Sequence, residues 1–114
     1  MMSLDAQNAS PEARYIFVIL HTYTETGGQP RTRLVMAYWN RHDASWDLQT
    51  NVNELLNGQA DLIADYRIRS DGYPLADGVI ECRMRRVGTV EIVHWFWIDV
   101  VRVRGRTWGE PWNE

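Results

Sequence analysis

The sequence contains no lysine and only one cysteine, Cys82. A single cysteine cannot form a disulfide within the chain, so the fold must rest on a hydrophobic core, and a reducing compartment is its simplest setting. All twelve basic residues are arginines. A GC-rich genome accounts for that bias, and selection for the forked, stacking guanidinium group at an interface is the alternative.

The chain also lacks a long hydrophobic run. Residues 1–8 have neither a basic region nor an apolar stretch, which argues against a signal peptide. The most apolar segment, residues 93–103, is interrupted by His94 and Asp99 and is too short for a membrane helix. We therefore expect a cytoplasmic protein that makes no contact with a membrane.

The common signatures of catalysis and cofactor binding are missing as well. The sequence has no glycine-rich phosphate loop, no nucleophile elbow, no Cys-x-x-Cys and no His-Glu-x-x-His. We therefore expect no cofactor, no metal and no enzymatic activity.

What is present describes an ordinary globular domain. With 114 residues, 45% hydrophobic and 24% charged, residues 1–114 can form one domain with a single core. We expect residues 1–12 to be a flexible N-terminal segment. We expect residues 105–114 to be an irregular tail that carries Trp108 and Trp112.

The most secure local prediction is a β-hairpin. Residues 14–24 and 31–40 are rich in β-branched and aromatic residues, and Gly27, Gly28 and Pro30 lie between them. Simple alternation along the second strand places Leu34 and Met36 on the same face.

The middle of the chain is harder to assign. Residues 40–45 resemble a turn, followed by a short strand over residues 46–49. Thr50 or Asn51 can cap a helix over residues 51–57. Residues 59–66 form a second helix, or continue the first helix through Gly58. The alternation of residues 66–69 indicates instead that a strand begins there.

Two further strands complete the prediction. Residues 79–86 alternate, with Cys82 facing inward as a buried, unreactive thiol and Glu81 facing outward. Residues 90–103 form a long central strand, for which we expect a bulge near Asp99. The chain is therefore an α+β domain: a mostly antiparallel sheet of four to five strands with one or two short helices packed on one face.

The tryptophans supply the main functional signal. Six tryptophans and five tyrosines are more large rings than a domain of this size readily buries, and exposed tryptophan, tyrosine and arginine are typical of protein-protein contact sites. We expect a non-catalytic protein-binding domain, an adaptor or an inhibitor of phage or immunity type. Its predicted contact residues are Trp95, Trp97, Trp108, Trp112, Arg102 and Arg104.

The central strand also predicts self-association. It is apolar on both faces, and a short helix covers only one face of a sheet. The tail then covers part of the other face, and a second copy covers the rest, so we expect a homodimer.

Two other functions remain open. A small enzyme or ligand-binding domain would have an aromatic-lined pocket near His21, His94 and Asp99. Nucleic-acid binding through the C-terminal arginines is a lesser alternative, because the net charge is −3 and the arginines of residues 83–86 and 102–106 do not form one patch.

A short resemblance accompanies these patterns. Val93-His94-Trp95, together with an earlier strand that ends in Tyr38-Trp39, is similar to small phage-borne domains of unknown function. The resemblance covers a handful of residues and implies no site.

Overall fold

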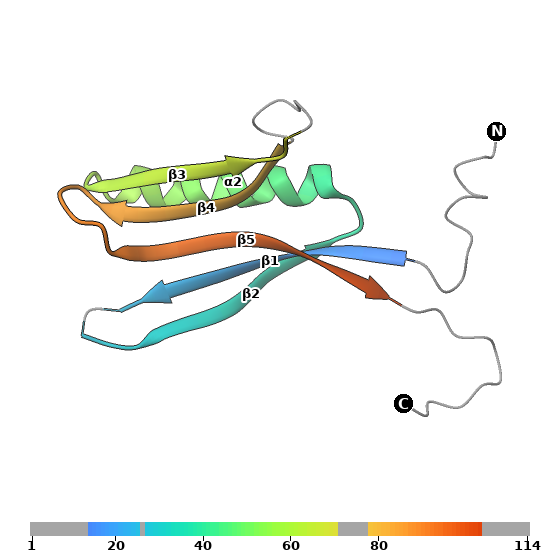
Figure 1. The fold of residues 1–114 in the computed structure, drawn as a ribbon, viewed down its shortest axis with the longest axis horizontal. Helices are drawn as coiled ribbons and strands as arrows, with labels where there is room; N and C mark the ends of the chain where they lie inside the picture. Colours follow the sequence, from blue (N-terminus) through green and yellow to red (C-terminus); the bar gives the residue numbers. More distant parts are fainter. Residues whose placement is uncertain (1–13, 26, 71–77, 104–114) are drawn as a thin grey trace.

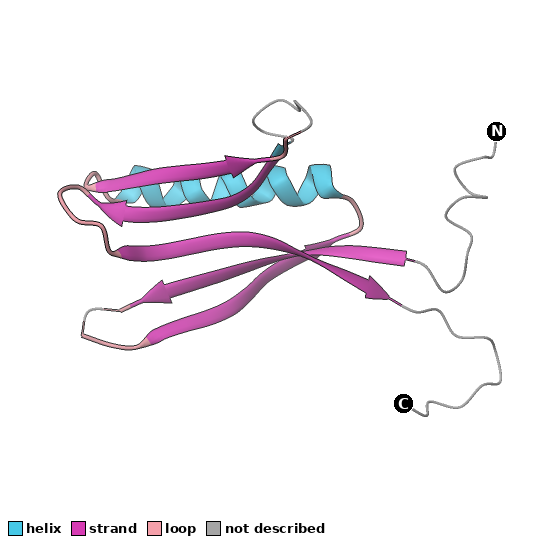
Figure 2. Cartoon of the chain, viewed as in Figure 1, coloured by secondary structure: helices cyan, strands magenta, loops and turns pink. Residues whose placement is uncertain are grey.

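A computed structural model describes residues 14–25, 27–70 and 78–103 of the chain. The predicted N-terminal segment 1–12 and the tail 105–114 lie outside these residues. The described residues form five strands and one helix (Figures 1 and 2). The elements are β1 (Arg14–Thr24), β2 (Pro30–Tyr38), α2 (Arg41–Gly58), β3 (Leu62–Ile68), β4 (Val79–Arg86) and β5 (Ile92–Val103).

The strands form one antiparallel sheet in the order β2-β1-β5-β4-β3. The helix α2 lies along one side of this sheet (Figure 1) and contacts every strand. The predicted α+β class is therefore confirmed. β5 is the central strand, as its apolar sequence indicated, and β2 and β3 are the two edges.

The hairpin of β1 and β2 is confirmed, with one correction. Ile19 pairs with Met36 and the next residue, Leu20, pairs with Leu34, so Val35 is an extra residue without a partner. This bulge reverses the alternation along β2 and places Leu34 and Met36 on opposite faces. The prediction that they share a face was wrong, because alternation read from one strand ignores an insertion relative to its partner.

The turn at residues 40–45 and the strand at residues 46–49 were also wrong, because both segments belong to α2. Asn40 caps the helix: its side chain accepts a hydrogen bond from the Asp43 amide at 2.8 Å and donates one to the Asp43 carboxylate at 3.0 Å. The predicted caps Thr50 and Asn51 lie in its interior. Tertiary packing favours the helix, because Ala44, Leu48 and Val52 are fully buried against the sheet.

The second helix over residues 59–66 does not form. Residues 62–68 instead pair with β4 as the edge strand β3, which begins four residues earlier than the alternation of residues 66–69 indicated. α2 ends at Gly58, and the amide of Gln59 donates to the carbonyl of Leu55 at 3.0 Å.

The core lies between α2 and the inner face of the sheet. Phe96 of β5, Ile19 of β1 and Met84 of β4 meet Leu48 and Val52 there. The irregularity in β5 falls at Val93, which lacks a partner in β4, and not near Asp99 as expected. Among the described residues, no helix is both long and apolar enough to cross a bilayer.

The opposite side of the sheet carries no described helix, and we call it the free face. Strand pairing places on it Ile16, Val18 and Leu20 of β1 and Trp95, Trp97, Asp99 and Val101 of β5.

Candidate functional site

The most exposed aromatic side chains flank the start of α2. Ala44, Ser45 and Leu48 of α2 are buried, and the Ser45 hydroxyl donates to the carbonyl of Val79 at 2.7 Å. With those residues facing inward, Trp46 faces outward and is 58% exposed. Trp39 lies just before the cap and is 65% exposed. Sequence reasoning missed both residues, because it placed them in paired strands.

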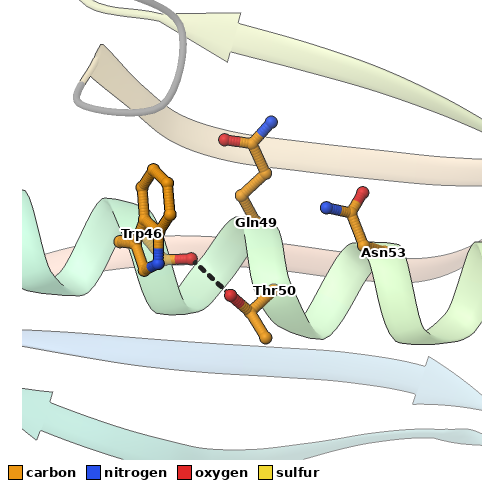
Figure 3. A pocket seen from close by; sticks show the side chains of 4 residues that line it. All are labelled: Trp46, Gln49, Thr50 and Asn53. Atoms are coloured by element: carbon orange, nitrogen blue, oxygen red, sulfur yellow. Dashed lines mark hydrogen bonds between the residues drawn. The ribbon is translucent and has the colours of Figure 1, made fainter.

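A hollow of about 180 Å³ lies beside Trp46 on the outer side of the helix. Its other lining residues, Gln49, Thr50 and Asn53, follow Trp46 along α2 (Figure 3). The Thr50 hydroxyl donates to the carbonyl of Trp46 at 3.0 Å. The amides of Gln49 and Asn53 give this hollow hydrogen-bond donors and acceptors.

A larger hollow, of about 440 Å³, shares Trp46 and extends toward the end of β2. Its other lining residues are Tyr38, His42, Asp43 and Asp47. The His42 and Trp46 rings stack with their centroids 6.5 Å apart. The hollow therefore combines three aromatic or heteroaromatic rings with two carboxylates.

Asp47 is hydrogen-bonded to side chains of both β2 and α2. The Tyr38 hydroxyl donates to Asp47 Oδ2 at 2.7 Å, and the Asn51 amide donates to the carbonyl of Asp47 at 2.8 Å and, more weakly, to its Oδ1 at 3.3 Å. Burial, followed by the hydrogen bond to Asp47, raises the pKa of Tyr38 to about 12. Tyr38 is therefore a neutral hydrogen-bond donor at physiological pH.

The predicted contact residues Trp95 and Trp97 lie together on the free face, with ring centroids 4.4 Å apart. Both are half-buried. Arg102 is exposed near the end of β5. The remaining predicted contacts, Arg104, Trp108 and Trp112, lie outside the described residues.

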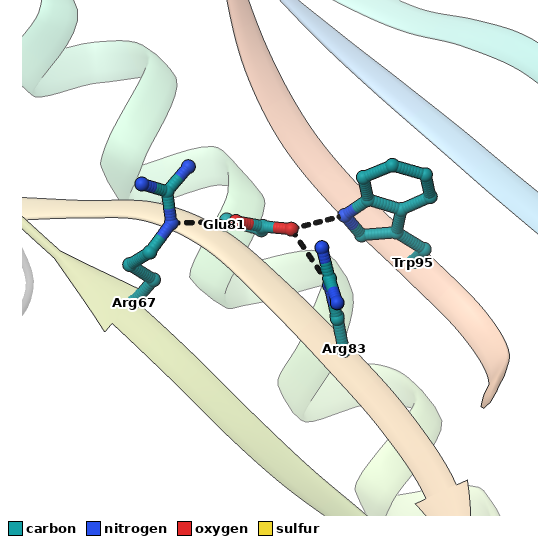
Figure 4. Close-up of polar contacts among 4 residues, drawn as sticks. All are labelled: Arg67, Glu81, Arg83 and Trp95. Atoms are coloured by element: carbon teal, nitrogen blue, oxygen red, sulfur yellow. Dashed lines mark hydrogen bonds and ion pairs between the residues drawn. The ribbon is translucent and has the colours of Figure 1, made fainter. Parts of the chain in front are cut away.

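Trp95 also takes part in a charged cluster around Glu81 (Figure 4). The Glu81 carboxylate accepts from Arg67 Nε at 2.6 Å, from Arg83 Nε at 2.9 Å and from Trp95 Nε1 at 2.6 Å. The Arg83 guanidinium lies 5.0 Å from the centroid of Trp95. Glu81 lies on the free face, away from the core, as the alternation predicted, but the cluster leaves only 6% of it exposed.

The pKa of Glu81 reflects two opposing effects. Burial alone raises it, but the hydrogen bonds from Arg67, Arg83 and Trp95 outweigh burial and hold the pKa of Glu81 below its usual value. The carboxylate is therefore ionised and fully occupied by donors, which identifies it as a structural group.

His21 and His94 do come together, as the pocket hypothesis required. His21 Nε2 and His94 Nδ1 are 3.0 Å apart, and Arg33 Nε donates to His21 Nδ1 at 3.0 Å. Asp99 does not join them, because it lies on the free face opposite Val18. The described residues contain no group of three or more side chains placed to hold a metal ion.

The histidine pair is packed rather than open. The His21 ring stacks on Phe96 with a centroid distance of 4.0 Å and an interplanar angle of 4°, and only 4% of the residue is exposed. Neither histidine lines the hollows beside Trp46. Burial, aided by Arg33 and His94, lowers the pKa of His21 to about 4, so the pair is neutral at physiological pH.

The other candidate groups have structural partners. Cys82 is fully buried, as expected, and burial raises the pKa of its thiol to about 12. Arg85 pairs with Asp65 at 3.5 Å and Arg86 pairs with Asp61 at 2.9 Å.

Comparison of the chain with protein-family models, with curated proteins and with solved structures gives no match.

Proposed function

We propose that this protein is a small non-catalytic domain that docks on another protein through the aromatic surface at the start of α2. The observation that carries the proposal is the exposure of Trp39 and Trp46, at 65% and 58%, on either side of the helix cap. Large apolar rings in water are costly, and tryptophan is enriched among the residues that dominate binding energy at protein interfaces.

The surface has the mixed character of such a contact site. Trp46 lies between two hollows that also contain carboxylates, amides and a hydroxyl. An indole provides apolar area with little loss of conformational entropy, and the polar groups around it provide specificity. Trp95 and Trp97, by contrast, are half-buried, so the more exposed Trp39 and Trp46 are the main anchors in this proposal.

An adaptor or an inhibitor is the class of binding protein that we propose. Small acidic domains without catalytic motifs serve as phage-type and immunity-type inhibitors, and this comparison rests on size and charge alone. A cytoplasmic location is part of the same proposal, because Cys82 is a free, buried thiol and a reducing compartment is its simplest setting.

We further propose that two copies associate through the free face or the edge of the sheet. Leu34 of the edge strand is 61% exposed and Val101 is 39% exposed, and strand pairing places both on the free face with Trp95 and Trp97. Burying such groups against a second copy would favour a homodimer.

Affinity capture from the native host with three proteins tests the main proposal. These are the wild type, the double variant Trp39→Ala/Trp46→Ala, and Glu54→Gln, which changes an exposed residue of the same helix. We expect a partner that wild type and Glu54→Gln retain equally and that the double variant loses. A partner retained by all three proteins would show that the aromatic surface is not the docking site.

A further inference from the structure

We propose that the hollow formed by Tyr38, His42, Asp43, Trp46 and Asp47 receives an arginine side chain from an extended segment of the partner protein. This inference rests on the proposed function, and it specifies the chemistry that the aromatic surface recognises.

The walls of the hollow suit a planar cation. Trp46 offers an exposed indole face, and His42 stacks beside it. A guanidinium group placed over an indole is attracted by the negative face of the ring. The volume of about 440 Å³ lies within the range of about 300–1,000 Å³ that is typical of ligand sites.

The negative charge of the hollow also favours an arginine side chain. The Asp43 carboxylate accepts one hydrogen bond from the Asn40 amide, and the Asp47 carboxylate accepts hydrogen bonds from Tyr38 and Asn51. All of these donors are neutral, so they leave both negative charges in place. Within the described segments, the ion-paired carboxylates are Glu81, Asp65 and Asp61, and those of the hollow are not among them.

Elsewhere in the same chain, an arginine packs on a tryptophan and donates to a carboxylate. In the cluster of Figure 4, Arg83 lies over Trp95 and donates to Glu81. The hollow beside Trp46 has the indole and the carboxylates of such a cluster, and its described lining residues include no arginine. The neighbouring Arg41 lies with its guanidinium 5.0 Å from the centroid of Phe17, so it is directed toward β1.

A chemical argument favours arginine over lysine, and a structural observation favours a peptide over an isolated cation. A guanidinium group can stack on a ring and donate to a carboxylate in a fork at the same time, which an ammonium group cannot do. The second hollow continues from Trp46 past Gln49 and Asn53 (Figure 3). The amides there can bind the backbone of an extended segment that follows the arginine.

Titration of the full-length protein with three blocked pentapeptides tests the inference. The peptides share the sequence Gly-Ser-X-Ser-Gly, where X is arginine, lysine or the neutral isostere citrulline. Binding is measured by calorimetry for every protein, and the NMR signal of the Trp46 indole N–H locates the contact in the proteins that keep this residue. We expect saturable binding of the arginine peptide, binding of the lysine peptide that is about threefold or more weaker, and no saturation with citrulline.

Variants locate the site. We expect Trp46→Ala and Asp47→Asn to weaken arginine-peptide binding about fivefold or more. Glu54→Gln removes the same unit of charge from the same helix, and we expect it to change binding less than twofold. Circular dichroism shows whether Asp47→Asn remains folded. The second variant, Asp43→Asn, removes a charge of the hollow and keeps the hydrogen bond between Tyr38 and Asp47.

Three outcomes would overturn the inference: equal binding of the citrulline peptide, equal loss in Glu54→Gln, or tighter binding after Arg104→Gln/Arg106→Gln. The last result would mean that the chain's own tail occupies the hollow. The two proposals can fail separately. Loss of partner capture in the Trp39/Trp46 variant without arginine-peptide binding would refute only the arginine guest. Arginine-peptide binding with unchanged capture would refute the docking surface.

Discussion

His21 Nε2 and His94 Nδ1 lie 3.0 Å apart on neighbouring strands, although 73 residues separate them in sequence. Arg33 can only donate, so the Nδ1 atom of His21 accepts its hydrogen bond and the ring proton of His21 lies on Nε2. His21 therefore donates to His94, and the three side chains form one directed chain of hydrogen bonds. Protonation of His21 would remove the acceptor for Arg33 and place two cations in contact.

This arrangement predicts acid sensitivity. The pKa of His21 falls from 6.5 to about 4 on folding, so the unfolded chain binds more protons between these values. Stability should be complete above pH 6.5 and should decrease as the pH falls toward 4, by about 1–3 kcal/mol in total. Urea denaturation at several pH values measures the slope. We expect His21→Phe to reduce this slope and to leave a remainder from His94, because burial lowers the pKa of His94 as well; an unchanged slope in His21→Phe would contradict this assignment.

Replacement of Glu81 by glutamine should destabilise the sheet. The substituted side chain would lack the charge that attracts Arg67 and Arg83, and its amide N–H groups would face donors that need an acceptor. Both arginines reach solvent, with side chains 69% and 55% exposed, which limits the cost to about 1–3 kcal/mol. Equilibrium denaturation measures it, with Glu54→Gln as the exposed control. Equal stability of the two variants would show that the cluster contributes nothing.

Gly88 should tolerate no side chain without strain. It turns the chain between β4 and β5 with φ at 84°, and a Cβ there would meet nothing within 4 Å. The cost of Gly88→Ala is therefore conformational, about 1 kcal/mol. Gly58→Ala is the matched control, because Gly58 is equally open without a positive φ. We expect thermal melting to show a loss for the first variant and none for the second.

Cys82 should react with thiol reagents only when the chain opens. The residue is fully buried and burial raises its pKa to about 12, so few thiolates form and reagents do not reach them. Labelling by a chromogenic disulfide should be slow in buffer and fast in denaturant. Rapid labelling of the native protein would mean that the sheet opens locally at β4.

The homodimer proposal predicts a mass of about twice 13.3 kDa in sedimentation at micromolar concentration. Leu34→Arg on the edge strand and Trp97→Arg on the free face should shift the protein to monomer, because a charge at a self-contact is opposed by its own symmetry mate. Trp46→Arg, on the helix side, is the control. A monomer for the wild type would exclude the association.

The sequence by itself determined the β1–β2 hairpin, the central position of β5 and the burial of Cys82, because alternation and β-branched content are local properties of each strand. The prediction from sequence was wrong around Trp46, because the polar residues 40–45 resembled a turn. The cap formed by Asn40 and Asp43 and the spacing of Ala44, Leu48 and Val52 were the signals of the helix there.

The extent of the helix, the register of the strands and the choice of exposed rings depend on packing between elements. Helix α2 extends over residues 41–58 because its inner side is buried against the sheet, a contact that no local pattern contains. The bulge at Val35 depends on how two strands align, and the contact between His21 and His94 depends on the same register. Exposure of Trp46 likewise follows from which side of α2 meets the core. Residue type predicted that rings would be exposed, and packing determined which ones.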